Sequence, residues 1–549
     1  MEMWDKKVIV LAIVVVLLFC LPGFVGRGAG AVNNGGSNSA REAVPIPEGL
    51  WEPYEQELVL TTVVAENSGT SFKDGDTYDN NPWYRAFKER FNISLTNLWV
   101  SNDYSTKLNL AIADRDLPDF CSVNAQQLAS LEKSGLIMDL TELFETYASD
   151  TLKGYMEAER DTYETGCLGG RLYGIPQLSY GNIDKFDYVW IRKDWKDELG
   201  LADPQTMDDV IAIAKAFKEN FGGYAMGEMQ NLDNLNRLAV GFGAHPGIWI
   251  ELEDGTLGYG TVQPEMKEVI ATYAEWYAEG IINPDFTTTN QDKMFQDAIN
   301  GDVGVIPFAQ WFGYNPGPQI IENLGAEAIF EPYPIPSANG AEVTGSVKFG
   351  NNGYIVISKN CKNPEGVLKL INLWCYMMDD AAGNEDPEYI TSLYDNNYPN
   401  CVHMLSVINT MTDYNQYVQV TEALAKGLDA DVTELGKNAS KYNSCVAWLT
   451  EQDPDGVGDW LQQGNDKSAY GIAKEYLDSG TYLKDAKWGQ DTATLQSVGS
   501  TLNDILVEGF TQIIIGEKDI DYFDDLVEQW WKAGGEMATA EINETYGSN

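Results

Sequence analysis

The sequence predicts a protein of two or more domains with mixed α/β architecture. A chain of 549 residues is too long for one hydrophobic core, and 44% of its residues are hydrophobic, as in folded globular proteins. Strand-like and helix-like segments alternate between residues 57 and 123 and again between residues 187 and 308. This alternation is typical of doubly wound sheets. No fixed-period repeat is present, which argues against a solenoid or a propeller.

The first α/β unit begins with the β-rich run ELVLTTVV at residues 57–64. Pro82 then starts the segment PWYRAFKERF, whose aromatic residues repeat every fourth position and define one face of a helix. Two further strand-like runs, ISLTNLWV (93–100) and LPDFCSV (117–123), flank a second helical segment. These strands predict a parallel sheet, and ligands bind beyond the carboxyl ends of such strands. Those ends lead into the loops at 66–81 and 122–126.

The second unit follows the same pattern. DYVWI (187–191) is typical of a buried strand, and Thr206 with Asp209 has the spacing of a capping box at the start of a helix. Another helix is closed by Gly280 and followed by Pro284. Short strands are expected at 301–308 and 353–358, and the C-terminal residues read mostly as helices and loops.

The N-terminus has the layout of an export signal. Lys6 and Lys7 precede an unbroken apolar run that ends at Phe19, and this run is shorter than the roughly 20 residues of a stable bilayer span. LLFC resembles a lipobox with Cys20 as the lipid-anchored residue, although a small residue usually stands where Phe19 does. Cleavage at Ala29-Gly30-Ala31 and an uncleaved anchor are the two alternatives. We predict a signal and lipid-anchor segment over 1–32 and a flexible tether over 33–56.

The net charge argues against nucleic acid and anionic membranes as partners, and the cysteine spacing argues against a zinc or redox motif. Lys and Arg number 36 against 83 Asp and Glu, a net charge of −47, so nucleic acid and anionic membrane surfaces are not expected partners. Six cysteines follow Cys20, and none has C-x-x-C spacing, which argues against a zinc or redox motif. Disulfides and buried free thiols both fit the pattern.

Signs of catalysis and of metal binding are few. His245 and His403 are the only histidines, and neither a G-x-S-x-G nor a Walker A motif occurs. In DPDGVGD (453–459) the glycines fall wrongly for an EF-hand loop. We therefore predict no enzyme activity, no cofactor and no metal. With 83 acidic residues, a glycosidase carboxylate pair stays an open alternative.

Six segments in a fixed order resemble one known family. The chain resembles the extracellular solute-binding protein family 1 of ABC importers, in its LplA-like lipoprotein branch, which is related to maltose-binding proteins. The resemblance implies a two-lobed, periplasmic-binding-protein-like (type II) fold with hinge crossings and additional C-terminal helices. Lobe 1 would comprise 57–180 and about 350–410, and lobe 2 would comprise 181–349 and about 411–549. The matching segments are LNLAIADRDLPDF (108–120), GLIMDLTELFETYA (135–148), GRLYGIPQ (170–177), WIRKDWKDELGLADPQTMDDV (190–210), WYAEGIINPDF (276–286) and SKNCKNPEGVLKLINLW (358–374).

This resemblance implies an extracellular protein, held at the membrane by a lipid anchor, that captures an oligosaccharide in an interlobe cleft and delivers it to an ABC permease. The acidity of the chain favours a neutral sugar. A secreted carbohydrate-active enzyme and a peptide-binding importer protein are the alternatives. Sugar binding needs aromatic faces and convergent polar groups. The expected ligand contacts are Asn81, Trp83, Ser122, Asn124, Tyr180, Asn182, Trp190, Trp249, Trp311, Asn351 and Asn352.

Overall fold

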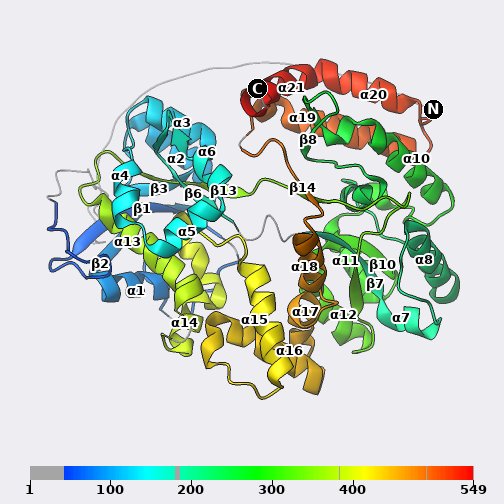
Figure 1. The fold of residues 1–549 in the computed structure, drawn as a ribbon, viewed down its shortest axis with the longest axis horizontal. Coiled ribbons are helices and arrows are strands. Elements are labelled where there is room, and N and C mark those ends of the chain that lie inside the picture. Colours follow the sequence, from blue (N-terminus) through cyan, green and yellow to red (C-terminus); the bar gives the residue numbers. More distant parts are fainter. Residues whose placement is uncertain are drawn as a thin grey trace, which may run out of the picture. The chain divides into compact units, whose positions relative to one another are not determined.

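The computed structural model describes residues 43–547 except residues 68, 74, 180–185, 382–383 and 490. Its buried hydrophobic residues form four clusters. Two clusters draw on residues 54–178 and 354–408, and we call this part lobe 1. The other two draw on residues 186–347 and 417–542, and we call this part lobe 2. The two-lobed α/β fold predicted from the sequence is confirmed (Figure 1).

The sheets of lobe 1 are parallel only in their first pair. β1 (Leu58–Ala65) pairs in parallel with β2 (Ile93–Ser101), as the strand–helix–strand pattern predicts. The third expected strand, β3 (Phe120–Val123), instead pairs antiparallel with β13 (Asn351–Ile357). The other neighbour of β13 is β6 (Ile175–Leu178), also antiparallel. The expected parallel sheet of three strands is therefore wrong at its third strand.

Side chains replace the missing backbone ladder between β1 and β3. The Asp119 carboxylate accepts hydrogen bonds from the backbone N–H of Thr61 at 2.7 Å and from its hydroxyl at 2.8 Å. The Thr62 hydroxyl donates to the Phe120 carbonyl at 3.0 Å. β3 is thereby held beside β1 while its own backbone groups pair with β13.

Helices cover the sheets of lobe 1. Trp83, Phe87 and Phe91 lie on one buried face of α1, as their fourfold spacing predicts. The helices are α1 (Pro82–Phe91), α2 (Tyr104–Asp114), α3 (Ala125–Lys133), α4 (Thr141–Tyr147), α5 (Asp150–Ala158), α6 (Arg160–Thr165), α13 (Pro364–Cys375) and α14 (Pro387–Tyr394), with the helical turns η5 (Tyr376–Asp380) and η6 (Asp395–Leu405) and the small hairpin of β4 (Cys167–Leu168) and β5 (Arg171–Leu172).

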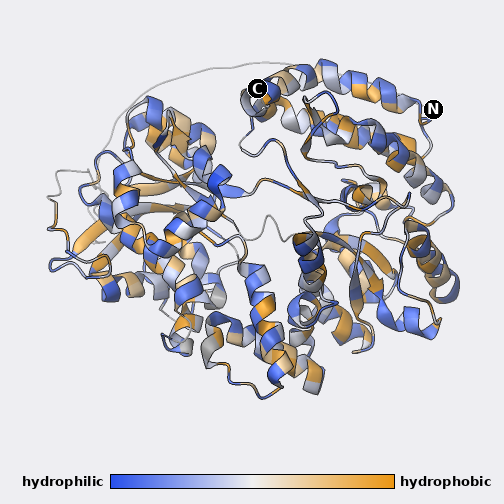
Figure 2. Cartoon of the chain, in the orientation of Figure 1, coloured by the Kyte–Doolittle hydropathy of each residue, from blue (hydrophilic) through white to orange (hydrophobic). Residues whose placement is uncertain are grey.

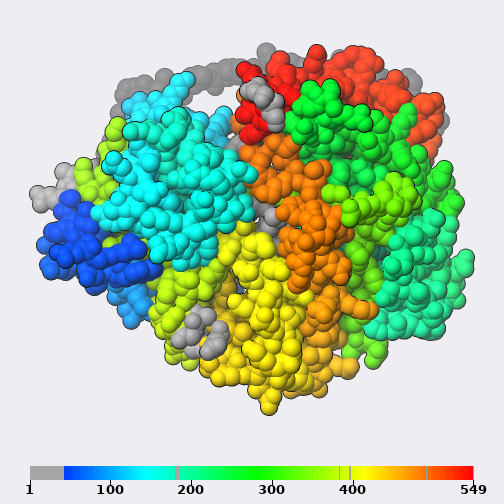
Figure 3. Space-filling view, viewed as in Figure 1, coloured from blue at the N-terminus to red at the C-terminus, as the bar shows by residue number. Residues whose placement is uncertain are grey.

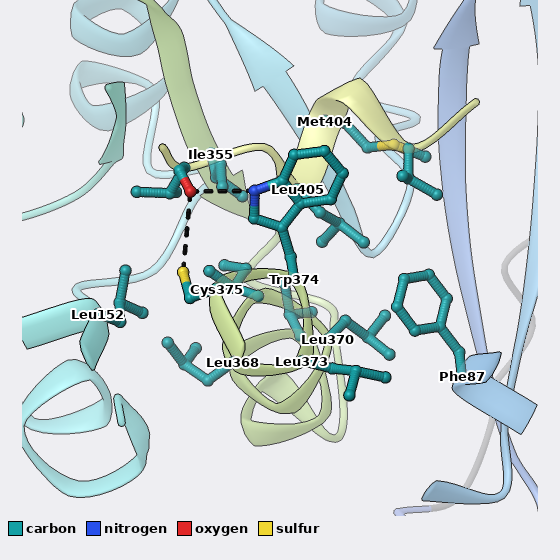
Figure 4. Packing of buried hydrophobic residues seen from close by; sticks show 14 of the residues in the cluster. Phe87, Leu152, Ile355, Leu368, Leu370, Leu373, Trp374, Cys375, Met404 and Leu405 are labelled. Atoms are coloured by element: carbon teal, nitrogen blue, oxygen red, sulfur yellow. Dashed lines mark hydrogen bonds between the residues drawn. The ribbon is translucent and has the colours of Figure 1, made fainter. Parts of the chain in front are cut away.

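The core of lobe 1 centres on α13, every residue of which from Glu365 to Cys375 is buried. Figure 4 shows Trp374 among aliphatic side chains, with its indole N–H donating to the Val407 carbonyl at 3.0 Å. The same carbonyl lies 3.8 Å from the Cys375 sulfur. The segment around Val407 is thus fixed to α13 by polar contacts inside an apolar core.

The first described residues of the chain are fastened to the same helix. Asn363 exchanges two hydrogen bonds of 2.8 Å with the backbone of Val44. The buried Lys369 ammonium donates to the carbonyls of Gly49, Leu50 and Glu52 at 2.8, 2.6 and 3.1 Å. Three carbonyl acceptors satisfy the three donors of one ammonium group. Residues 44–52 are therefore part of lobe 1.

The central sheet of lobe 2 is built around β7 (Asp187–Arg192). β10 (Val305–Ala309) and β11 (Phe330–Pro334) lie on either side of it, both antiparallel. Every residue of β10 is buried, as is β7 beyond Asp187. Figure 2 shows many of the strand residues in the colour of hydrophobic side chains, with hydrophilic residues on the surrounding helices.

Two further strand pairs complete lobe 2. β8 (Trp249–Glu251) and β9 (Leu257–Tyr259) form a hairpin. β12 (Gly345–Val347) pairs in parallel with β14 (Tyr482–Lys484), which joins the C-terminal part of the chain to the segment that returns toward lobe 1.

The two helices that the sequence predicts in lobe 2 are present as α8 (Met207–Phe221) and α10 (Pro264–Ala278). Thr206 caps α8, and Asp209 completes the expected capping box. The helices are α7 (Lys193–Glu198), α8 (Met207–Phe221), α9 (Asp233–Leu238), α10 (Pro264–Ala278), α11 (Gln291–Asn300), α12 (Gly317–Leu324), α15 (Thr412–Lys426), α16 (Ala439–Glu451), α17 (Pro454–Gln463), α18 (Ala469–Ser479), α19 (Ala493–Ile514), α20 (Tyr522–Trp530) and α21 (Glu536–Tyr546), with the helical turns η1 (Ala239–Phe242), η2 (Gly260–Val262), η3 (Phe286–Thr288), η4 (Gln310–Gly313), η7 (Thr433–Asn438) and η8 (Trp531–Gly535).

The six cysteines of the described residues are free thiols. Cys167 is half-buried, and the other five, Cys121, Cys361, Cys375, Cys401 and Cys445, are buried. Of the two alternatives that the sequence left open, the structure shows free thiols. Within residues 43–547, as far as they are described, no helix is both long and apolar enough to cross a bilayer.

Candidate functional site

A cavity of about 360 Å³ lies on lobe 2, at the N-terminal end of β7. β10 places Trp311 there, because the strand ends at Ala309 and the turn η4 brings the indole to its carboxyl end. We call this cavity the Trp311 pocket. Its lining residues are Phe186, Asp187, Asp233, Asn236, Arg237, Val240, Pro246, Ala309, Gln310, Trp311, Ser346, Lys348 and Phe349.

The half-buried Trp311 ring is held rigidly from behind. Its centroid lies 4.9 Å from that of Phe308 and 5.8 Å from that of Phe295, both in edge-on geometry. Edge-to-face packing of this kind fixes the orientation of an aromatic ring. One part of the Trp311 side chain therefore offers a preorganised apolar surface to the pocket.

Arg237 links two carboxylates in the wall of the pocket. Its guanidinium forms ion pairs with Asp187 and, at 2.6 Å, with Asp233, and it lies 5.0 Å from the centre of the Phe308 ring. Burial disfavours the charged form of Arg237, but the two carboxylates outweigh burial, so its pKa is raised. Asp187, Arg237 and Asp233 thus form a bridged group with a net charge of −1, whose carboxylate oxygens are acceptors for hydroxyl groups.

Glu228 holds the start of the helix that carries Asp233 and Arg237. One oxygen of this buried carboxyl group accepts hydrogen bonds from the N–H groups of Met229 at 2.8 Å and Asn234 at 3.1 Å. Burial raises the pKa of Glu228 to about 8. The carboxyl group is therefore mostly protonated at neutral pH, and it fixes the first turn of α9 beneath the pocket.

Replacing Glu228 with glutamine is expected to remove one source of pH dependence from the stability. The folded-state pKa of Glu228 lies above its unfolded value, so its stabilising effect is complete below about pH 4.5 and is lost as the pH rises to about 8. Glutamine mimics the protonated form at every pH. The variant should gain stability relative to the parent from pH 5 to pH 9, by up to about 5 kcal/mol. Urea denaturation across this range measures the difference, and parallel curves would contradict the assignment.

Lobe 1 carries an aromatic and polar cluster at the carboxyl ends of β2 and β3. Half-buried Trp99 lies 5.4 Å from Tyr104, measured between ring centroids, and Tyr104 lies 5.7 Å from the ring of His403. The Tyr104 hydroxyl donates to the Ser122 carbonyl at 2.9 Å. Burial lowers the pKa of His403, so this ring is neutral at pH 7. Because β1 and β2 are parallel, the carboxyl end of β2 is where a sheet of this type is expected to meet its ligand.

Gln177 connects the cluster to the segment after α14. The Ser122 hydroxyl donates to the Gln177 side-chain oxygen, and the Gln177 amide nitrogen donates to the His403 carbonyl at 2.6 Å. Asn351, on the neighbouring strand β13, has a buried side-chain nitrogen without a hydrogen-bond partner among the described residues. Polar groups from three segments of lobe 1 therefore converge at this edge of the sheet.

Two tryptophans expected to contact ligand lie in the core instead. Trp83 and Trp190 are both 0% exposed. The Trp83 indole N–H donates to the Leu393 carbonyl at 2.8 Å, and that of Trp190 donates to the Ala309 carbonyl at 3.1 Å. Their apolar surface is packed and their donors are used. The structure therefore gives no support to Trp83 and Trp190 as ligand contacts.

Three polar residues of the expected set have local structural roles. Asn81 is buried and accepts a hydrogen bond from the Tyr84 N–H at 3.1 Å as the cap of α1. Asn124 is exposed and caps α3 by accepting from the Gln127 N–H at 2.9 Å. Ser122 is buried and bonded to Gln177. Of these three, Asn124 remains accessible to a ligand.

The other expected residues divide between cavity walls and open surface. Trp311 lines the pocket that carries its name, and Trp249 lines a second cavity on lobe 2. Asn352 is exposed beside the half-buried Asn351 at the crossing from lobe 2 to lobe 1. Tyr180 and Asn182, like Cys20, lie outside the described residues.

Sequence reasoning missed the charged residues of the Trp311 pocket and the aromatic residues of the lobe 1 cluster. Asp187 and Arg237 are 50 residues apart, so no local pattern joins them. Trp99 and Tyr104 did carry a signal, because they stand near the end of a strand and the start of the following helix. In the described part of the chain, no group of three or more His, Cys, Asp or Glu side chains is arranged to hold a metal ion.

Comparison of the sequence with known proteins finds one family. Residues 69–374 match the family of bacterial extracellular solute-binding proteins. The chain is 23% identical over 499 residues to the lipoprotein LipO of Bacillus subtilis (strain 168), covering 86% of this chain and 90% of LipO. It is 29% identical over 194 residues to the fructooligosaccharide ABC transporter substrate-binding protein FusA of Streptococcus pneumoniae, covering 34% of this chain and 35% of FusA.

A solved structure shares the fold. The HMO-binding, ABC-transporter-associated solute-binding protein of Bifidobacterium longum infantis superimposes with a TM-score of 0.60 at 16% sequence identity. The superposition covers 90% of this chain and 99% of that protein. The likeness therefore extends over the C-terminal helices as well as the residues that match the family.

Proposed function

The chain belongs to the bacterial extracellular solute-binding protein family, and from this we propose that it captures a neutral oligosaccharide and delivers it to the permease of an ABC importer. The observation that carries the substrate class is the Trp311 pocket. It combines a fixed aromatic face with the carboxylate oxygens of Asp187 and Asp233, which suit the C–H faces and the hydroxyl groups of a sugar. FusA, a relative by sequence, bears the name of a fructooligosaccharide-binding protein.

Charge in the pocket supports a neutral sugar. Arg237 is occupied by Asp187 and Asp233, so it has little capacity left for the carboxylate of an acidic sugar. Lys348 is the second basic side chain that lines the pocket. The charges of Arg237 and Lys348 together balance those of the two carboxylates. A uronate would face the negative side of the Asp187–Arg237–Asp233 group, which costs free energy in a partly buried site.

Capture would involve two states of the protein, an open and a closed arrangement of the lobes. The ligand contacts the Trp311 pocket of lobe 2 and the Trp99–Tyr104–His403 cluster of lobe 1, and closure of the lobes brings both surfaces onto it. The ligand shifts the equilibrium by the difference between its affinities for the closed and the open form. The permease then recognises the closed form. No bond of the sugar is broken in this scheme.

A glycoside hydrolase is the rival interpretation of the same carboxylates. A glycosidase needs one carboxyl group that keeps its proton as the general acid. Asp187 and Asp233 are bridged by one guanidinium, which leaves neither free for that role. The family of binding proteins to which the chain belongs supports the same conclusion.

A thermal-shift screen of the purified protein tests the proposal. A ligand that binds only the folded state raises the melting temperature in proportion to the logarithm of its concentration once it saturates. We expect shifts with neutral oligosaccharides and not with uronate oligosaccharides or peptides. Each glycan is recovered and its length is measured by chromatography. Recovery of shortened glycan would establish the hydrolase, and a shift with peptides alone would establish a peptide-binding protein.

We also propose that Cys20 carries the lipid that holds the protein at the cell surface. The relative LipO is named a lipoprotein, and LLFC precedes a Gly/Asn/Ser-rich segment in this chain. Replacing Cys20 with alanine is expected to abolish both the lipid and the cleavage before residue 20, so the variant keeps the apolar run that ends at Phe19 and gains the corresponding mass. Mass spectrometry of the parent protein should find a diacylated N-terminal Cys20. An unmodified N-terminus at Val32 would instead show cleavage after Ala31.

A further inference from the structure

A second cavity, of about 340 Å³, lies on lobe 2 between the β8–β9 hairpin, the segment after β14 and the helices α19 and α20. We call it the Tyr259 pocket. Lys348 and Phe349 line both this cavity and the Trp311 pocket, so the two cavities share a wall. The helical side of the Tyr259 pocket comes from residues 491–530, which follow the part of the chain that matches the family.

The Tyr259 pocket has a preorganised aromatic wall. Tyr259 stacks on Trp530 with ring centroids 5.7 Å apart and planes inclined by 7°, and it lies 5.4 Å from Trp249. Trp249 and Trp530 are almost fully buried, while Tyr259 is half-buried. The two tryptophans thus fix the Tyr259 ring from behind. Phe349 adds a second half-buried ring, held edge-on by Trp488 at 5.5 Å.

Polar groups converge on the same cavity without a net charge. The Asp485 carboxylate is buried and accepts hydrogen bonds from the backbone N–H groups of Trp249 at 2.9 Å and Lys487 at 3.0 Å. The Lys487 ammonium is paired with Asp491 at 2.9 Å. With Lys348, which it shares with the Trp311 pocket, the cavity holds two acidic and two basic side chains, so the two cavities together are lined by four acidic and three basic side chains. Fixed aromatic faces with compensated charges are the features that suit the Trp311 pocket to a neutral sugar.

The segment between β14 and α19 also reaches lobe 1. The Trp488 indole N–H donates to the Thr162 hydroxyl at 3.2 Å, and Figure 3 shows orange atoms of this C-terminal segment beside cyan atoms of lobe 1. The Tyr259 pocket is therefore next to the side of lobe 2 that meets lobe 1, where a ligand held between the lobes has access to it.

We propose that the Tyr259 pocket is a second saccharide subsite. The ligand is then an oligosaccharide long enough to extend from the Trp311 pocket, across Lys348 and Phe349, into the cavity formed by the C-terminal helices. This inference rests on the proposed function and adds the length of the ligand and the role of the C-terminal helices to it. Short saccharides occupy the Trp311 pocket alone, and each further sugar unit that reaches Tyr259 adds affinity.

Gly499 provides the variant that tests the subsite. It lies on α19 in the wall of the cavity, and a Cβ atom built at this position meets nothing within 4 Å. Tryptophan at position 499 places a bulky ring in the wall of the cavity from an unobstructed Cβ position, and tryptophan is a better helix former than glycine. Gly499→Ala keeps the cavity open. Gly154→Trp, at a helix glycine of lobe 1 that is equally unobstructed, controls for an added surface tryptophan.

The experiment measures dissociation constants by calorimetry for linear neutral fructans and glucans, from disaccharide to hexasaccharide. In the parent protein, affinity should rise with length. Gly499→Trp should bind the hexasaccharide roughly tenfold more weakly than the parent and the disaccharide equally well, while both control variants behave as the parent. Thermal melts confirm that each variant is folded.

The outcomes separate the two proposals. Binding of a hexasaccharide by Gly499→Trp with the affinity of the parent overturns the subsite alone, as does a parent affinity that does not rise with length. Failure of the parent protein to bind any neutral glycan in the series overturns the proposed function together with the subsite.

Discussion

Replacing Trp311 with alanine is expected to weaken oligosaccharide binding by about 30-fold, which corresponds to about 2 kcal/mol. The half-buried indole is an aromatic surface of the Trp311 pocket, and Phe308 and Phe295 hold it in position. Its loss removes this stacking face and leaves Phe349 and the Asp187–Arg237–Asp233 group among the remaining walls of the pocket. Calorimetric titration with the glycan that gives the largest thermal shift measures the change.

Two further variants test whether the loss of affinity comes from the aromatic ring at position 311. Trp311→Phe keeps a ring in the same place and should recover most of the affinity. Trp51→Ala removes an exposed tryptophan of lobe 1, 46% of whose surface is accessible, and should leave the affinity unchanged. Equal affinity of the parent and Trp311→Ala would place the ligand elsewhere on the molecule.

Replacing Trp190 with alanine is expected to lower the free energy of unfolding by about 4 kcal/mol. This ring is completely buried on β7, with the Phe312 ring 5.3 Å away, and its N–H donates to the Ala309 carbonyl. Truncation leaves a cavity in the core and an unpaired carbonyl group. Urea denaturation measures the loss.

Trp190→Phe separates the two contributions. It restores most of the volume and loses only the hydrogen bond, which costs about 1–2 kcal/mol. Because Trp190 has no surface toward the Trp311 pocket, the folded fraction of either variant should bind the glycan nearly as the parent does. A variant with unchanged stability and lost binding would restore Trp190 as a ligand contact.

Individual elements could be predicted from the sequence where their signals are local, and the two-lobed arrangement was implied by the family resemblance. The fourfold aromatic spacing in α1 and the capping box of α8 are read within one or two turns of helix, and both are present in the structure. The strand β3 shows the limit of such signals. Its position beside β1 was expected, but its backbone partner is β13, more than 200 residues further along the chain.

The candidate site was harder to predict because exposure is decided by distant partners. Periodicity shows which face of a helix is buried, and it does not show which ring at the edge of that face reaches a cavity. Trp83 is enclosed by the segment around Leu393, and the two residues are 310 positions apart. Arg237 is paired with Asp233 on its own helix, and it is held in the pocket wall also by Asp187, which is 50 residues away in the sequence. Trp311, which lines a cavity, was singled out because it follows the end of a buried strand and because the resemblance to maltose-binding proteins implies a stacking tryptophan there.

The attachment of the chain's first described residues to α13 has a mechanical consequence. Val44 is bonded to Asn363, and the carbonyls of residues 49, 50 and 52 are bonded to Lys369, so tension on the chain before Val44 passes directly into the central helix of lobe 1. Lobe 1 is therefore the part of the described chain on which such tension acts first, and lobe 2, which is bonded to lobe 1 through Trp488 and Thr162, receives it second.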